Sequence, residues 1–186
     1  MAINYIITMP RLQRALDTVI REFESEGIWT DRVYNKIDVY LTWWPASAYG
    51  WQFYGTSGNI VIPAISISRL VNQLGHDYKV SLTDVLRHEY AHGVAHCYPR
   101  LVRAKQFRAA FGDGHDSAAK KQEYDPNCFV TNYASTHPSE DFPENFMYYL
   151  KHKGKLPNRF QHPTIRKKWN FVKRLLKQIS SGKLTW

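Results

Sequence analysis

The residues best suited to chemistry are two histidines and a glutamate near the middle of the chain. His88, Glu89 and His92 form an H-E-x-x-H pattern within the run from Leu86 to Gly93. In a helix, residues four apart project from one face about one turn apart, so both imidazoles can reach a single Zn²⁺. Glu89 would lie beside the ion, where its carboxylate can act on a metal-bound water. The pattern therefore predicts a hydrolytic zinc site.

The surrounding sequence favours a helix at this position. Ser81 can cap the helix, and Asp84, three residues later, is an acidic partner near its positive end. Val85 and Leu86 can anchor the helix in a core, and the helix must stop before Pro99. The motif thus has the rigid support that a metal site needs.

A catalytic zinc site usually has three protein ligands and an open position for water. His96 continues the i, i+4 series, but it lies about 12 Å along the helix from His88, whereas two ligand nitrogens must be within about 4 Å of each other. We therefore exclude His96 as the third ligand and expect it to line the cleft, to support the site or simply to pack. The other candidates are His115, His137, Glu140 and Glu144.

Glu140 and Glu144 are four residues apart, which places two carboxylates on one face of a helix. One could bind zinc while the other accepts the second ring N–H of His88 or His92. A solvated helix surface is an equally good interpretation of the spacing alone.

The joint pattern of H-E-x-x-H with Tyr133-Ala134 and the downstream run from His137 to Glu144 resembles the gluzincin metallopeptidases. It is most similar to predicted zinc-binding metallopeptidases whose second motif reads Y-A-x-x-x-P-x-E-D-F-A-E, and is related to the catalytic domain of anthrax lethal factor. The two motifs cover roughly a third of the chain. The resemblance implies peptide-bond hydrolysis with one catalytic zinc, His88, His92 and Glu140 as ligands, Glu89 as general base, Glu144 as support for a ligand, and Tyr133 as a phenol facing the site.

One residue departs from that family pattern. Pro143 stands where the pattern has alanine, and proline lacks the N–H and clashes with the preceding turn. We therefore expect the helix that carries the two glutamates to begin close to Pro143 or to kink there. His137 precedes Pro138, which biases its backbone away from helical geometry.

In the expected reaction, Glu89 first takes a proton from the zinc-bound water and later delivers it to the leaving amine. Tyr133, or else His96 or His137, would donate to the developing oxyanion. The segment 59–62 is the candidate edge strand on which an extended peptide substrate could add.

The rest of the chain predicts an α+β, zincin-like fold. A small N-terminal mixed or antiparallel sheet accompanies the helix of the motif, and a mainly helical C-terminal part faces it across an active-site cleft. Hydrophobic periodicity predicts helices at 9–25, 66–75 and 163–179, strands at 36–44, 49–54 and 59–62, irregular structure at 100–127, and renewed order at 131–150. We expect one domain, 1–186, divided into 1–98, 99–162 and the basic helix 163–186.

Aromatic residues gather in the strand region, where they could form a sugar-binding platform. We favour the interpretation that they build the core of the sheet and its packing against helices. They are Trp43, Trp44, Tyr49, Trp51, Phe53 and Tyr54.

The net charge of +9 is concentrated at the end of the chain. Residues 151–186 hold 11 Lys and Arg and no Asp or Glu, leaving 14 basic against all 16 acidic residues before them, a net of −2. A helix with one apolar and one basic face could contact a polyanion, although we favour an apolar face packed on the body and a solvated basic face.

The sequence shows neither a signal peptide nor a transmembrane segment, and its two cysteines, Cys97 and Cys128, are too few for a disulfide framework. These features favour a cytoplasmic location with reduced thiols, while export by another route stays open. The oligomeric state is not predicted.

Two other functions compete with the peptidase hypothesis. Gly114-His115 after H-E-x-x-H on a basic protein resembles the SprT-like proteases weakly, and would make His115 the third ligand of a protease acting on DNA-associated proteins. The other alternative is a catalytically silent protein that binds zinc or a polyanion. Asp113 and Asp116 lack the further ligands that a calcium loop needs.

Overall fold

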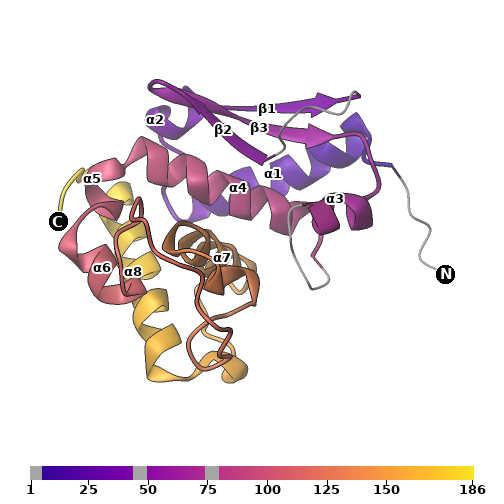
Figure 1. Ribbon diagram of the computed structural model, residues 1–186. Coiled ribbons are helices and arrows are strands. Elements are labelled where there is room, and N and C mark those ends of the chain that lie inside the picture. The colour runs from indigo at the N-terminus through magenta and orange to yellow at the C-terminus, as the bar shows by residue number, and fades with distance from the viewer. Residues whose placement is uncertain (1–5, 44–49, 74–79) are drawn as a thin grey trace.

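The computed structural model describes residues 6–43, 50–73 and 80–186, and within them the expected α+β class is confirmed. Figure 1 shows a small sheet lying over α4 and α1, with α6, α7 and α8 on the other side of α4. The helices are α1 (Met9–Ser25), α2 (Asp31–Tyr34), α3 (Ile67–Gln73), α4 (Leu82–Cys97), α5 (Pro99–Val102), α6 (Lys105–Phe111), α7 (Pro138–Lys151) and α8 (Pro163–Ser180). The strands are β1 (Ile37–Thr42), β2 (Gly50–Tyr54) and β3 (Ser57–Pro63), and single 3₁₀ turns occur at Tyr133–Ser135 and Asn158–Phe160.

The sheet is mixed, with strand order β1-β3-β2. β3 pairs parallel to β1 and antiparallel to β2, so it is the central strand. The expectation that 59–62 forms an edge is therefore wrong, and both β2 and β3 contact α4. Of the predicted strand residues, Trp44 and Tyr49 lie outside the described residues, as do the last two positions of the helix expected at 66–75.

α4 carries the H-E-x-x-H motif and is buried on nearly every side between the sheet and α7. Its start is the predicted capping box, in which the Ser81 hydroxyl accepts from the Asp84 N–H and Asp84 accepts from the Ser81 N–H. Gly93 allows the sheet to approach, because a Cβ there would lie 2.4 Å from the Ile37 side chain. The cap and the close contact hold the motif in place.

α7 begins at Pro138 and continues as an α-helix through Pro143. Of the two alternatives expected at Pro143, a helix start close to that residue is not met, since the first turn precedes it, and a kink there stays a prediction. His137 is extended, as predicted from the following proline, and its imidazole accepts from the Ser139 N–H as the helix cap.

Two expectations about the rest of the chain are met only in part. Residues 112–127 are irregular as expected, but residues 99–111 are mostly helical, because Leu101, Phe107 and Phe111 are buried in the common core. Most of the strand aromatics that the structure describes do not build that core. Trp43, Phe53 and Tyr54 are 79%, 68% and 60% exposed, and Trp51 is half-buried at its margin.

The apolar stripe of α8 packs into the core through Ile165, Trp169 and Val172, and the basic residues of its opposite face are exposed. Cys97 and Cys128 are free thiols. No helix among the described residues is both long and apolar enough to cross a membrane.

One basic residue of α8 is an exception, because Lys168 is buried. Its ammonium lies 2.6 Å from the Asp141 carboxylate of α7 and donates to the Cys128 carbonyl at 2.6 Å. This pair joins α8 to the helix that carries Glu140 and Glu144.

Lys168→Met should lower the free energy of unfolding by about 3 to 5 kcal/mol, because Asp141 would stay buried without its partner. Chemical denaturation of this variant and of Lys167→Met, which alters an exposed neighbour, provides the measurement. Lys167→Met should change stability by about 0.5 kcal/mol at most. Equal, small losses in both variants would contradict the assigned role of the pair.

Candidate metal centre

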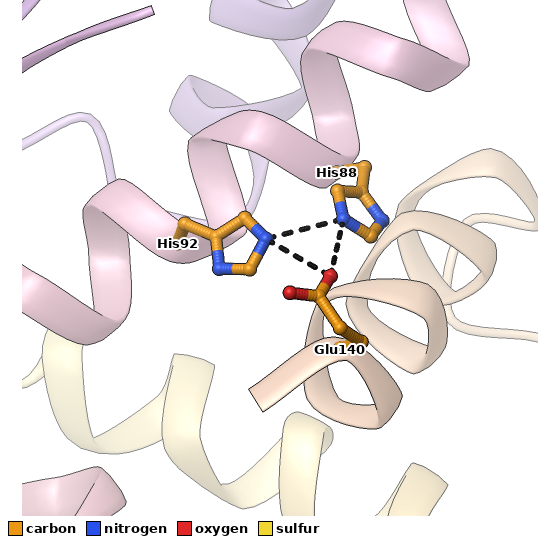
Figure 2. A group of neighbouring side chains, drawn as sticks. All are labelled: His88, His92 and Glu140. Atoms are coloured by element: carbon orange, nitrogen blue, oxygen red, sulfur yellow. Dashed lines mark hydrogen bonds and ion pairs between the residues drawn. The ribbon is translucent and has the colours of Figure 1, made fainter. Parts of the chain in front are cut away.

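His88, His92 and Glu140 form the one group of three potential ligands that the described part of the chain brings together. Figure 2 shows the two imidazoles projecting from α4 and the carboxylate from α7 toward a common point. The His88 Nε2 atom lies 3.2 Å from the His92 Nε2 atom and 3.2 Å from the Glu140 Oε2 atom, and the third side of the triangle is 3.4 Å.

These distances fit a tetrahedral zinc ion. Ligands at about 2.0 to 2.1 Å from zinc lie about 3.3 to 3.4 Å from one another when the angles are tetrahedral. Two histidines and one glutamate are also a donor set that catalytic zinc sites use, with the fourth position left for water or substrate. The chemistry and the spacing of the three donors therefore both fit Zn²⁺.

The orientation of His88 is fixed from behind by Glu144. This carboxylate is fully buried, and it accepts from the His88 Nδ1–H at 2.8 Å and from the Thr131 hydroxyl at 2.6 Å. The Thr131 oxygen in turn accepts from the Ala134 N–H. A proton kept on Nδ1 leaves the Nε2 lone pair directed at the site, which is how such partners position metal-binding histidines.

The electrostatics of the group are those of a cation site. Burial lowers the pKa of His88, but its hydrogen bonds with Glu140 and Glu144 outweigh burial and raise the pKa to about 10. Burial raises the pKa of Glu140, yet the charges and hydrogen bonds of His92 and His88 hold it well below its usual range. Two carboxylates thus favour positive charge between α4 and α7, and a metal ion can supply that charge in place of a proton.

Glu89 points toward the sheet, and the backbone of β2 holds its carboxylate there. The Glu89 Oε2 atom accepts from the Trp51 N–H of β2 at 2.7 Å. Gly50 makes room for this contact, because it has φ +82° and a Cβ there would lie 2.8 to 2.9 Å from the Glu89 carboxylate. The Glu89 carboxylate, next to the candidate ligands, is therefore positioned by the Trp51 N–H and by the lack of a side chain at Gly50.

A cleft of about 920 Å³ opens over the three ligands and Glu89. Tyr133 lines it, with its ring 5.7 Å from that of His88. Burial and the charges of Glu140 and Glu89 raise the pKa of the Tyr133 phenol. The phenol therefore keeps its proton and can act as a hydrogen-bond donor in the cleft.

The other three candidate histidines lie outside the group of three donors. His96 lines the cleft with its ring 5.7 Å from Trp51 and 5.6 Å from Phe53, away from the three ligands, as helix geometry required. His115 also lines the cleft, and its Nδ1 is bonded to Asp116 at 2.6 Å. His137 serves as the cap of α7, where its Nε2 also donates to the Ser117 carbonyl, and it does not line the cleft.

Sequence reasoning missed three contributors to the site: Thr131, the Trp51 N–H and Gly50. Sequence reasoning could have found Thr131, because it is a polar residue only two positions before Tyr133, where the second motif begins. The contact of residue 51 with residue 89 has no signal in sequence spacing, because it depends on where the sheet sits against α4.

Comparison with known proteins identifies a family. Residues 65–172 match the sequence model of a family described as "putative zinc-binding metallo-peptidase". This range includes the whole of α4 and α7, and with them all the residues of the candidate centre except those of β2. No curated protein and no solved structure matches this chain significantly.

Glu140→Ala should abolish stoichiometric zinc binding, because it removes one of three donor atoms, whereas His115→Ala should retain the metal. Elemental analysis of the purified proteins after dialysis against buffer with a weak chelator provides the measurement. Loss of zinc from His115→Ala together with retention in Glu140→Ala would contradict this centre and favour His115 as the third ligand.

Proposed function

This chain belongs to the family of zinc-binding metallopeptidases whose sequence model it matches, and we propose that it hydrolyses peptide bonds in the cleft over His88, His92 and Glu140. The observation that carries the proposal is the triangle of donor atoms at tetrahedral zinc spacing, with the Glu89 carboxylate fixed beside it. The arrangement supports a gluzincin-type site, in which a glutamate from a second helix completes the ligand set.

The proposed roles follow from position and charge. Zinc, when bound by His88, His92 and Glu140, would act as a Lewis acid that polarises the scissile carbonyl and acidifies water. Glu89 would accept a proton from the attacking water and pass it to the leaving amine. Its hydrogen bond with the Trp51 N–H holds one carboxylate oxygen, so the other can be directed toward the water.

Tyr133 is the proposed donor to the oxyanion. It lines the cleft close to His88, and its raised pKa keeps the hydroxyl protonated at neutral pH. Removal of one oxyanion donor typically costs about 2.7 to 4 kcal/mol of transition-state stabilisation. His96 is a weaker candidate because it lies at the far end of the cleft, and the position of His137 does not support that role.

An extended substrate would lie along β2. Within the described residues β2 pairs only with β3, and its Trp51 N–H points to the cleft side. Because alternate residues of a strand point their N–H groups to the same side, the Phe53 N–H also faces away from β3. A peptide could add to this edge by main-chain hydrogen bonds.

The competing functions have less support. A SprT-like protease with His115 as a ligand would need that histidine in the donor group, and it is bonded to Asp116 instead. A polyanion contact by α8 has the exposed basic face in its favour, but nothing connects that face to the cleft. A cytoplasmic location and the division into one domain stay predictions.

Glu89→Gln should keep zinc bound and reduce turnover by about 10² to 10⁴-fold, because the amide has the shape of the carboxylate but cannot accept the proton. Zinc content and hydrolysis of a broad pool of quenched-fluorescent peptides are measured on the same preparations. Turnover close to that of the wild type would sink the proposed mechanism.

Gly50→Ala should reduce kcat/KM by on the order of 10²-fold with zinc retained, because the new methyl group displaces the Glu89 carboxylate. Gly112→Ala is the matched control. Gly112 has φ +85°, nearly the same backbone strain, but open space around its Cβ position. An equal effect of both substitutions on hydrolysis would show that strain, rather than displacement of Glu89, is responsible.

A further inference from the structure

One end of the cleft carries three basic side chains. Arg32, Lys36 and Arg103 line it together with His96 and Cys97 at the C-terminal end of α4. The Arg32 guanidinium donates to the Cys97 carbonyl at 3.2 Å. Lys36 and Arg103 both help to lower the pKa of His96, after burial, so their charges converge on this histidine. The end of the cleft is therefore a region of positive potential.

This basic end lies close to the proposed reaction centre. His96 and Cys97 follow His92 by four and five residues, which is about 6 to 8 Å along a helix. An extended peptide advances about 3.3 Å per residue. A substrate side chain located about two residues from the scissile bond would therefore reach Arg32 and Lys36.

The positive charge is only partly neutralised by the protein. Arg103 pairs with Asp116 at 2.5 Å. No acidic side chain within 6–43, 50–73 and 80–186 forms an ion pair with Arg32 or Lys36. The other acids of the cleft, Glu89 and Glu140, are bonded to Trp51 and to the metal-binding histidines. Arg32 and Lys36 thus carry positive charge that no described carboxylate neutralises.

A simpler explanation is that these cations serve the C-terminal carbonyls of α4, where positive charge is favourable. Arg32 does so through its bond to the Cys97 carbonyl. That explanation gives no reason for Lys36 to line the cleft, because its positive charge would stabilise the end of α4 equally well from any other side. The half-buried ring of Trp51 and the exposed ring of Phe53 beside His96 also make this end a binding surface.

We infer that Arg32 and Lys36 form a subsite for a carboxylate, so the protein prefers peptides with Asp or Glu about two residues from the cleaved bond. The inference rests on the proposed function, because it assigns a substrate class to the same cleft. A carboxylate between two partly exposed cations gains a modest, salt-sensitive preference.

The test uses pairs of short quenched-fluorescent peptides that differ only by Glu or Gln at one position, with that position scanned across the peptide. The wild type should cleave the Glu member with a kcat/KM roughly fivefold or more above that of the Gln member at one position. In Arg32→Gln/Lys36→Gln the ratio should fall to about one, and in the wild type it should shrink at high salt. Lys167→Gln/Lys173→Gln removes the same charge from the exposed face of α8 and should keep the ratio.

A binding measurement separates this inference from the proposed function. Fluorescence anisotropy reports binding of labelled versions of the same peptides to the Glu89→Gln protein with and without the Arg32 and Lys36 substitutions. Preferential binding of Glu peptides without cleavage by the wild type would support the subsite and overturn the peptidase. Cleavage without any Glu preference, or a preference that survives Arg32→Gln/Lys36→Gln, would overturn the subsite alone.

Discussion

The hydrogen bond between the His88 Nδ1–H and the buried Glu144 carboxylate is the interaction on which the candidate centre depends. It sets which nitrogen of His88 carries the proton, and so directs the Nε2 lone pair toward His92 and Glu140. Glu140 lies on the same helix as Glu144, α7, one turn earlier. The two glutamates therefore hold opposite nitrogens of one imidazole, and α4 and α7 must keep their relative positions for either contact to exist.

The rest of the fold maintains that relation. α4 is packed against the sheet on one side, where Gly93 admits Ile37, and against α7 on the other. α7 is in turn joined to α8 by the buried pair of Asp141 and Lys168. The sheet also contributes directly, since the Trp51 N–H positions Glu89. Elements that carry no candidate ligand thus determine where Glu89 and the candidate ligands lie (Figure 1).

Local signals in the sequence were sufficient for the H-E-x-x-H helix, its capping box and the presence of a small sheet, which could equally have been antiparallel or mixed. The spacing of Glu140 and Glu144 fitted a solvated helix surface equally well, and their roles were implied by the family resemblance alone. A helix start close to Pro143, one of the two effects expected of that residue, is wrong, because the first turn of α7 is set by Pro138 and the His137 cap. Two kinds of feature could not be predicted. The exposure of Phe53 depends on where the small sheet ends over α4, and the Trp51–Glu89 contact depends on sheet placement.

The most direct test of the central claim is anomalous diffraction at the zinc edge from crystals of the zinc-loaded protein. The account predicts one strong peak about 2.0 to 2.2 Å from the His88 Nε2, His92 Nε2 and Glu140 oxygen atoms, with Glu144 on the far nitrogen of His88. A zinc peak coordinated by His96 or His115 in place of Glu140, or no zinc between α4 and α7, would contradict it.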